Sequence, residues 1–398
     1  MPKPRKVALL IESSNAYARG LLRGIESYVR EQGRWRIYLA EQGRGEQPPA
    51  WLRDWDGDGV IARIENSAIA RALAPLKIPI VDVSAARLLP KLPWFETDDA
   101  EFARLAAEHL LERGFTNFAF CGDAQFNWST WREEHFTRLI RAAGRACHCF
   151  QPSRPGKVTG EHIIDEIGRW LTGLPKPLGV FACYDLRGLQ VLDACRRLGL
   201  VVPDEIAVLG ADNDDLLCDL ADPPLSSIIP NTRRTGYEAA ALLDAMMAGK
   251  HRRAGVHLIP PIAIATRQST EVLAVPDRYV AHAVRQIRES SGKGLRVEEL
   301  ARAAGISRRL LEGRFQKLLG RSPHAEIVRA QLNRVKELLA CTDLTLREIA
   351  DRTGFQHVEY LSVVFKKKIG IPPSQYRSEQ QPHRRRQVGL GGSAARPQ

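Results

Sequence analysis

The chain has 398 residues, of which 44% are hydrophobic, and its formal net charge at pH 7 is +12. No segment reaches the 18 or more consecutive apolar residues that a membrane span needs, and the apolar run at residues 7–11 is too short for a signal peptide. The seven cysteines include no C-x-x-C pair, which argues against a disulfide framework and a zinc ribbon, so we expect a cytoplasmic protein of two or three domains.

The positive charge is concentrated near the C-terminal end. Residues 278–380 hold 20 basic and 11 acidic side chains, a net charge of +9, and residues 381–398 add four arginines and no acid. The rest of the chain carries a net charge of −1. A solvated basic face is the simpler explanation for any single run of charge, but this division favours a nucleic-acid module joined to a neutral domain.

Residues 1–270 alternate short apolar runs with amphipathic stretches. Strands are expected at 7–11, 35–39, 59–62, 78–82, 118–121, 178–181 and 206–209, and helices at 17–32, 99–112, 131–143, 186–198 and 233–248. Continuous apolar strands with helices between them are typical of parallel sheets covered on both faces. The fold class predicted for this part is therefore α/β.

In such a sheet the ligand site lies beyond the carboxyl ends of the strands. The polar residues that follow the apolar runs are Ser13–Asn15, Gly122–Asp123, Tyr184–Asp185 and Gly210–Asp214, with Trp128, Trp131 and Arg132 nearby. Any one of these loops could simply cap the next helix. Together they suit a polyhydroxylated ligand, because carboxylates and amides bond hydroxyl groups and aromatic faces cover the C–H surface of a sugar.

Three segments, 182–185, 202–213 and 224–228, resemble the sugar-binding core of the LacI/GalR repressors, which have the two-lobed periplasmic-binding-protein fold. The resemblance implies a sugar-binding domain over 1–270. The residues it assigns to the sugar, together with those after the first strand, are Asn15, Tyr17, Arg132, Tyr184, Asp185, Asp212 and Asn213. Tyr184 stands where that family commonly has Asn, which leaves the sugar open. Because the first strand begins so close to the start, we expect DNA contacts to come from another part of the chain.

The basic region contains an internal repeat. The strings ELARAAGIS (299–307) and EIADRTGFQ (348–356) each place a glycine four residues after an alanine, and F-x-K-x-x-G-x-x-P then begins at Phe315 and again at Phe365. In a helix-turn-helix the small alanine lets the second helix approach, and Gly305 or Gly354 supplies the positive φ of the turn. Two copies in tandem predict an all-α domain with two such motifs over 278–380.

Each second helix would lie in a major groove with polar residues near its N-terminus facing the base edges. The side chains expected at DNA are Ser307, Arg308, Arg309, Glu312 and Arg314 in the first motif and Gln356, His357, Glu359, Tyr360, Lys366 and Lys367 in the second. Ser307 is the expected N-cap of its helix, and Arg314, Lys366 and Lys367 are expected at phosphates rather than bases. For each exposed residue the alternative is a solvated side chain.

The region 278–380 resembles the AraC/XylS family of bacterial transcription factors along its whole length. The resemblance is carried by Gly354–Phe355, Tyr360–Leu361, Phe365–Lys367 and Gly370–Arg377. The sequence departs from the family pattern at Leu361, at Pro372 and at Gly313, a glycine inside the first reading helix that costs about 0.5–1 kcal/mol relative to alanine.

A LacI-type sensor followed by an AraC-type reader resembles the family of bacterial xylose operon regulators, here along nearly the full chain. The resemblance implies a pentose-responsive activator, with D-xylose as the first expectation, that binds operator DNA as a homodimer and contacts RNA polymerase at the nucleoid. No cofactor and no metal is expected. The linker over 271–277 would carry the signal, and the tail 381–398, with Arg384–Arg386, would be disordered.

Two alternatives remain at this point. Catalysis is disfavoured because no G-x-S-x-G, H-E-x-x-H, P-loop or G-x-G-x-x-G motif occurs in the expected context. Cys147 and Cys149 could form half of a zinc site, but the sequence has no second pair at zinc spacing. The carboxylates of Asp212, Asp214 and Asp215 suit sugar hydroxyl groups as readily as they suit hydrolysis. The second alternative is a DNA-binding repressor or architectural protein whose sensor domain is vestigial or has a different specificity.

Overall fold

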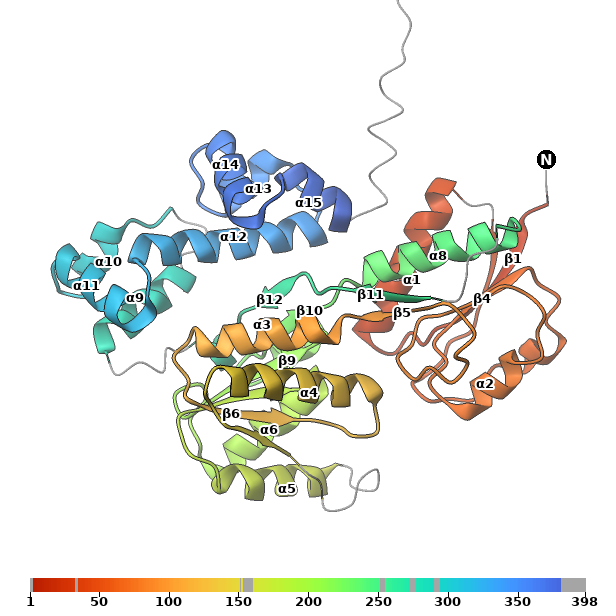
Figure 1. Ribbon diagram of the computed structural model, residues 1–398, viewed down its shortest axis with the longest axis horizontal. Coiled ribbons are helices and arrows are strands. Elements are labelled where there is room, and N and C mark those ends of the chain that lie inside the picture. The colour runs from red at the N-terminus through yellow and green to blue at the C-terminus, as the bar shows by residue number, and fades with distance from the viewer. Residues whose placement is uncertain are drawn as a thin grey trace, which may run out of the picture.

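The computed structural model describes residues 3–32, 35–150, 152, 160–250, 255–271, 277–289 and 294–380. Its first two-thirds forms two lobes, each built on a six-stranded sheet (Figure 1). The sheet of the first lobe has the order β11-β5-β4-β3-β1-β2, and its paired strands run parallel. Its elements are β1 (Arg5–Leu10), α1 (Ala16–Gln32), β2 (Trp35–Leu39), a 3₁₀ turn (Ala50–Asp54), β3 (Gly59–Ala62), α2 (Ser67–Leu73), β4 (Ile80–Asp82), β5 (Trp94–Thr97), α8 (Thr232–Met247) and β11 (Val256–Ile259).

The sheet of the second lobe has the order β12-β10-β9-β8-β6-β7, with β12 antiparallel to its neighbour. Helices α3 and α4 pack on one face and α5 and α6 on the other, so both faces are buried. The elements are α3 (Asp99–Leu111), β6 (Asn117–Cys121), α4 (Asn127–Ala142), β7 (Cys147–Cys149), α5 (Glu161–Thr172), β8 (Leu178–Ala182), α6 (Asp185–Leu198), β9 (Ile206–Ala211), α7 (Asp215–Leu220), β10 (Ser226–Ile229), β12 (Ala263–Ala265) and a 3₁₀ turn (Gln268–Thr270).

Three crossover segments join the lobes. They lie between β5 and α3, between β10 and α8, and between β11 and β12. Two of them carry helix caps: Asp98 accepts a hydrogen bond from the backbone N–H of Glu101, and Asn231 accepts one from that of Arg234. A cleft between lobes joined in this way can open and close as the crossovers bend.

The α/β prediction is confirmed, and the long helices begin and end within a few residues of their predicted bounds. The sequence patterns did not reveal α2, β5, α5, α7, β10, β11 or β12. Strand β10 shows why: it opens with Ser226 and Ser227, which are fully buried yet polar, and their hydroxyls donate to the Arg267 carbonyl and to Asp185.

The described residues between 278 and 380 fold into an all-α domain of seven helices. These are α9 (Arg278–Glu289), α10 (Val297–Ala303), α11 (Arg308–Leu319), α12 (Pro323–Cys341), α13 (Leu346–Arg352), α14 (Val358–Ile369) and α15 (Pro373–Gln380). Two cores lie along the long helix α12: Ile327 packs into the first, with Phe315, whereas Val335 and Leu339 pack into the second, with Phe365. One helix therefore supports both motifs.

The predicted repeat is confirmed as two helix-turn-helix units. Gly305 and Gly354 have φ values of +68° and +73° at the equivalent turns, the left-handed conformation that the spacing predicted. Ser307 caps α11 by accepting a hydrogen bond from the backbone N–H of Leu310, at 3.3 Å. Thr345 and Glu348 form a reciprocal capping box at the start of α13.

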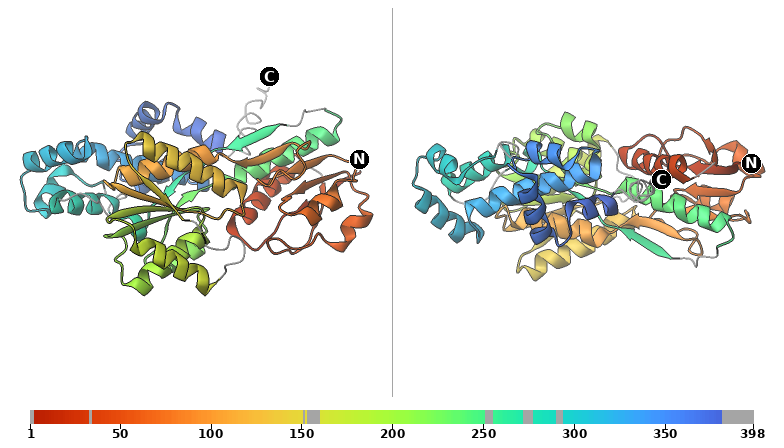
Figure 2. Two further views of the ribbon diagram at one scale, coloured as in Figure 1. Left: turned by 60° about the horizontal axis from the view of Figure 1, so that its bottom comes forward. Right: turned by 90° about the horizontal axis from the view of Figure 1, so that it is seen from above.

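The helical domain packs against the lobes through α12 and α15. Ala340 contacts Ile229 and Ile262, two residues beside the crossovers, in a small apolar cluster. The Tyr376 hydroxyl donates to the Ile262 carbonyl at 3.4 Å, and the Asn231 amide donates to Gln380. In all three orientations, the helices α9–α11 project beyond the second lobe, at the end of the molecule opposite the N-terminus (Figures 1 and 2).

Residues 272–276, most of the predicted linker, and 381–398, the whole predicted tail, lie outside the described residues.

Candidate ligand cleft and nucleic-acid interface

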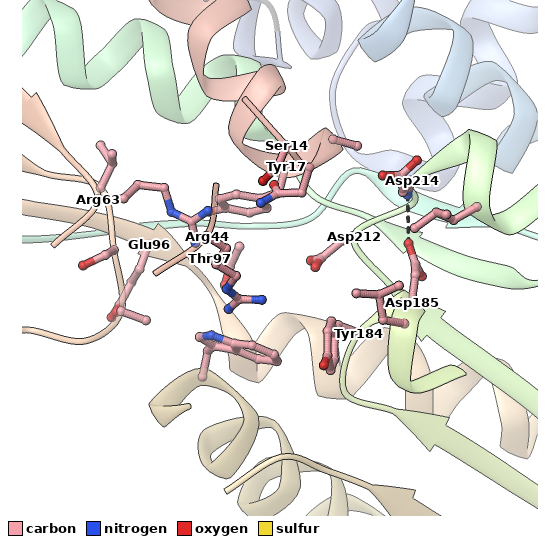
Figure 3. A pocket seen from close by; sticks show the side chains of 18 of the residues that line it. Ser14, Tyr17, Arg44, Arg63, Glu96, Thr97, Tyr184, Asp185, Asp212 and Asp214 are labelled. Carbon is pink, nitrogen blue, oxygen red and sulfur yellow. Dashed lines mark hydrogen bonds between the residues drawn. The ribbon is translucent and has the colours of Figure 1, made fainter. Parts of the chain in front are cut away.

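A cavity of about 370 Å³ lies between the two lobes, beyond the carboxyl ends of strands from both sheets (Figure 3). Both lobes supply its walls. The first lobe and its crossover contribute Ser14, Asn15, Ala16, Tyr17, Arg44, Arg63, Val83, Ser84, Ala85, Glu96 and Thr97, and the second contributes Trp128, Arg132, Tyr184, Asp185, Leu186, Asp212, Asp214 and Leu217. A ligand held here would touch both lobes, so its binding would favour the closed arrangement.

Arg132 is fixed at the floor of the cleft. Its Nε donates to Asp99 Oδ1 at 2.7 Å and its Nη1 to the Cys183 carbonyl at 2.6 Å. The guanidinium carbon lies 4.3 Å from the ring centre of Phe102 and 5.0 Å from that of Trp128. Because the guanidinium is held from several sides, its remaining N–H groups have a defined direction and can serve a ligand oxygen.

The cations of the first lobe are each matched by an acid. Arg63 forms ion pairs with Glu12 and Glu65 and lies over the ring of Tyr17, and Arg87 pairs with Glu96. With Asp185, Asp212 and Asp214 on the opposite wall, the cleft has no excess of positive charge, which disfavours an anionic ligand.

Several polar atoms at the cleft have no hydrogen-bond partner among the described residues. They include Arg63 Nε, Glu96 Oε2 and, behind Arg132, Asp99 Oδ2. Buried polar groups are normally satisfied, so this concentration of unpaired, almost fully buried atoms shows that the walls behind the cavity are unusually polar.

Asp212 follows β9 and points into the cavity from the second lobe (Figure 3). Its backbone φ is +99°, a value that side-chain-bearing residues rarely adopt. Its carboxylate makes no hydrogen bond to any described residue, whereas its backbone N–H donates to the Ile228 carbonyl. Burial raises the pKa of Asp212, and the nearby arginines Arg132, Arg44 and Arg63 oppose that rise.

Asp185 holds the loop that carries Asp212. Its Oδ2 accepts from the backbone N–H of Asp214 at 2.8 Å and its Oδ1 from the Ser227 hydroxyl at 2.6 Å. Burial, reinforced by the negative charge of Asp212, raises the pKa of Asp185 to about 8. With both oxygens occupied, Asp185 positions the loop as well as lining the cavity.

Trp128 and Tyr184 form an aromatic wall. Their ring centres are 5.6 Å apart in an edge-to-face arrangement, and Trp128 also stacks on Phe126. Burial raises the pKa of Tyr184 to about 12, so its hydroxyl stays protonated at neutral pH and can donate.

Six of the seven sugar-site residues expected from the sequence line the cavity: Asn15, Tyr17, Arg132, Tyr184, Asp185 and Asp212. Asn213 does not. Its φ is +45°, and its side-chain oxygen accepts from Arg267 Nη1 at 2.9 Å, outside the cavity lining. Sequence reasoning missed Arg44, Arg63 and Glu96. Arg63 directly follows the strand β3, so the rule applied to the other strand ends could have found it.

The predicted reading helices expose the expected faces. Nine of the residues expected at DNA are exposed, and Glu312 is half-buried. The exposed ones are Ser307, Arg308, Arg309, Gln356, His357, Glu359, Tyr360, Lys366 and Lys367. A groove of about 490 Å³ separates the N-terminal ends of α11 and α14 and is lined by Arg308, Gln356, His357 and Tyr360 among others. The two N-terminal ends therefore share one face of the domain.

Two arginines of the first motif already have acidic partners. Arg308 pairs with Glu312, at 2.8 Å, and with Glu298, so DNA would have to replace these contacts. Arg314 is half-buried: it pairs with Asp277 and lies 4.9 Å from the ring centre of Tyr279. That position fastens α11 to the start of α9, and contact of Arg314 with phosphate stays a prediction.

The described residues contain no cluster of three or more His, Cys, Asp or Glu side chains that could hold a metal ion. Within the same residues, no helix is long and apolar enough to cross a membrane.

Three family models match consecutive parts of the chain. Residues 6–100 match the XylR N-terminal domain, residues 107–270 a periplasmic binding protein-like domain, and residues 300–379 a helix-turn-helix domain. The first match covers the part of the first lobe that precedes the first crossover, the second covers the second lobe together with α8 and β11 of the first lobe, and the third covers the two helix-turn-helix units.

Whole-length relatives have the same organisation. The xylose operon regulatory protein of Escherichia coli K12 is 32% identical over 383 residues, which cover 94% of this chain and 97% of the relative, and that of Haemophilus influenzae is 29% identical over 94% and 98%. A solved structure of the xylose-binding transcription activator xylR superimposes with a TM-score of 0.62 at 31% identity, over 94% of this chain and 98% of that one.

Proposed function

The chain belongs to the family of xylose operon regulatory proteins and is a DNA-binding transcription regulator rather than an enzyme; from this premise, we propose that it binds D-xylose in the cleft and operator DNA through α11 and α14. We further propose that it activates transcription in the bacterial cytoplasm as a homodimer that contacts RNA polymerase.

The observation that carries the sugar assignment is the carboxylate of Asp212. It points into the cavity with no hydrogen bond to a described residue, across from Arg63 and Glu96 of the first lobe. Acceptors and donors on opposite walls suit the hydroxyl groups around a small ring, and the paired rings of Trp128 and Tyr184 supply apolar surface for its C–H groups. The absence of excess positive charge among the lining residues favours a neutral sugar over a phosphorylated or acidic one.

The contact between the helical domain and the crossovers supports a route for the signal. Closure of the lobes bends the crossovers, and Asn231 and Ile262 there contact Gln380 and Tyr376 of the helical domain. A sugar that favours the closed form would then change the position of the reading helices, provided that DNA binds the two forms unequally.

A homodimer would use an apolar surface that the chain leaves exposed. Leu216 and Leu220 lie one turn apart on α7 and are 64% and 74% exposed. Sedimentation of the wild-type chain and of Leu220→Asp tests this proposal: a dimer that the substitution does not weaken would place the contact elsewhere.

Calorimetry with D-xylose, L-arabinose, D-ribose and D-glucose tests the sugar assignment. We expect the tightest binding for a pentose, with D-xylose first, and a change in the affinity for operator DNA when it binds. Absence of binding at millimolar concentration by every sugar would instead favour the vestigial sensor.

A further inference from the structure

Gly313 lies in the middle of α11, where no contact within the protein calls for glycine. Its φ lies outside the left-handed region, and a Cβ added to it would meet nothing within 4 Å. A glycine inside a helix still lowers helix stability relative to alanine, because it loses more backbone freedom on folding. The chain therefore bears a cost at Gly313 that its own fold does not require.

The other glycines inside described helices differ in this respect. An added Cβ would come within 2.1 Å of another backbone at Gly24 and Gly236, within 1.9 Å of Thr232 at Gly20, and within 2.8 Å of Leu225 at Gly188. Gly168 shows only an ordinary contact, at 3.5 Å from Leu198. Among the described helices, Gly313 is thus the interior glycine with open space around it.

The position of Gly313 on α11 shows which side of the helix the open space lies on. At 100° per residue, Gly313 lies about 200° around the helix from the buried Leu311, almost opposite the core. We name this place the outer position of the reading helix. Arg309 and Gln316, both exposed, lie about one turn before it and one turn after it along the helix. In a helix that lies in a major groove, the face opposite the core is the one turned toward the DNA, and the outer position is on that face.

The second motif supplies an internal comparison. The repeat aligns Phe315 with Phe365, so the outer position of α14 is Val363, flanked by Glu359 and Lys366. Val363 is 65% exposed, so that helix keeps an apolar side chain where α11 has none. The two reading helices have equivalent surroundings but different bulk at the point that would meet DNA.

From this difference we propose that Gly313 is a close-approach position: without a side chain there, α11 lies deeper in the major groove than α14, with its backbone against the base edges. The inference rests on the proposed DNA-reading role of α11 and adds to it the residue that sets the depth of the first helix. The favoured occupant is DNA because Arg309, Gln316 and Lys317 surround the position with donors suited to bases and phosphates.

The test uses the full-length chain and a labelled duplex enriched by the wild-type protein from a random-sequence pool. For Gly313→Ala we expect a higher melting temperature together with roughly tenfold weaker binding of the enriched duplex, and a larger loss for Gly313→Val, because each added methyl group holds the helix away from the bases. Binding of an unselected duplex should be unchanged, since contacts to phosphates do not require the helix to be fully seated.

Gly168→Ala is the matched control, since it makes the same change inside a helix of the sensor with only an ordinary contact nearby. It should leave both duplex affinities unchanged. If Gly313→Ala binds the enriched duplex as tightly as the wild type, or more tightly, the proposal is wrong. A lower melting temperature would also overturn it, because the glycine would then serve the fold. If the wild type itself enriches no duplex, the proposed DNA-reading function fails instead.

Discussion

Replacement of Asp212 separates the ligand contact from the stability of the fold. Asp212 has a φ of +99°, so Asp212→Gly removes the carboxylate and also the strain of a side chain in that conformation. Asp212→Asn keeps the shape and one acceptor oxygen but removes the charge. The pair of variants therefore tests the carboxylate without introducing the unfavourable backbone that alanine would meet.

The expected loss can be worked out from the cleft. The carboxylate has no hydrogen bond to a described residue, so both oxygens are available to ligand hydroxyl groups, and a hydrogen bond to a charged group contributes about 1.5–3 kcal/mol. Two such bonds correspond to about 3–6 kcal/mol, or roughly 10²- to 10⁴-fold in affinity for Asp212→Gly. Relief of backbone strain is worth about 1–3 kcal/mol and is partly offset by the flexibility of glycine in the unfolded chain.

Calorimetry with D-xylose measures the first effect and thermal unfolding without sugar measures the second. We expect Asp212→Gly to lose sugar binding, Asp212→Asn to lie between it and the wild type, and neither to melt at a lower temperature. DNA affinity in the absence of sugar should be unchanged in both. Retention of wild-type sugar affinity by Asp212→Gly would refute the assignment, and joint loss of DNA affinity would show that sensor and reader are not separable.

Three further predictions follow from other contacts. Burial raises the pKa of Asp185 to about 8 from 3.8, so the folded state binds the Asp185 proton more tightly than the unfolded state, and the contribution of this group to stability is lost as pH rises from about 4 to about 8. Asp185→Asn cannot ionise, so its melting temperature should depend less on pH across that range; an unchanged pH dependence would contradict the shift. If Val363 touches a thymine methyl group, Val363→Ala should weaken operator binding about fourfold, and replacing that thymine with deoxyuridine should weaken the wild type but not the variant in a binding titration. Gln380→Ala removes the contact with Asn231, so xylose should still bind but change DNA affinity less in a paired titration with and without sugar; an undiminished response would remove this contact from the signal route.

The sequence predicted those features that local patterns determine. Strands buried on both faces read as continuous apolar runs, and Gly305 and Gly354 marked both turns because few other residues adopt their φ. The repeat was visible because both motifs must bury the same small and aromatic residues, such as Phe315 and Phe365.

The remaining parts of the site depend on contacts between distant segments. Arg44 and Glu96 reach the cleft only because the strand order brings their loops and strands to the edge opposite Asp212. The predicted list placed Asn213 beside Asp212, but its backbone turns the amide toward Arg267, 54 residues away in the chain. No local pattern records such a partner, so adjacency in sequence was a poor guide to which of the two side chains faces the ligand.

The shared helix α12 has a consequence for the operator. Because Ile327 packs in the core of one motif and Val328, Leu332 and the residues after them pack in the core of the other, one residue inserted between Ile327 and Val328 would turn the second reader by about 100° relative to the first and move it about 1.5 Å along the axis. Duplex DNA repeats about every 10 base pairs, so two helices that read successive major-groove segments must be rotated and spaced to match that repeat. If both helices read DNA, the length of α12 therefore sets the spacing required between the two base sequences in the operator. An insertion in α12 should be compensated only by a change in that spacing, and an altered operator only by a change in α12.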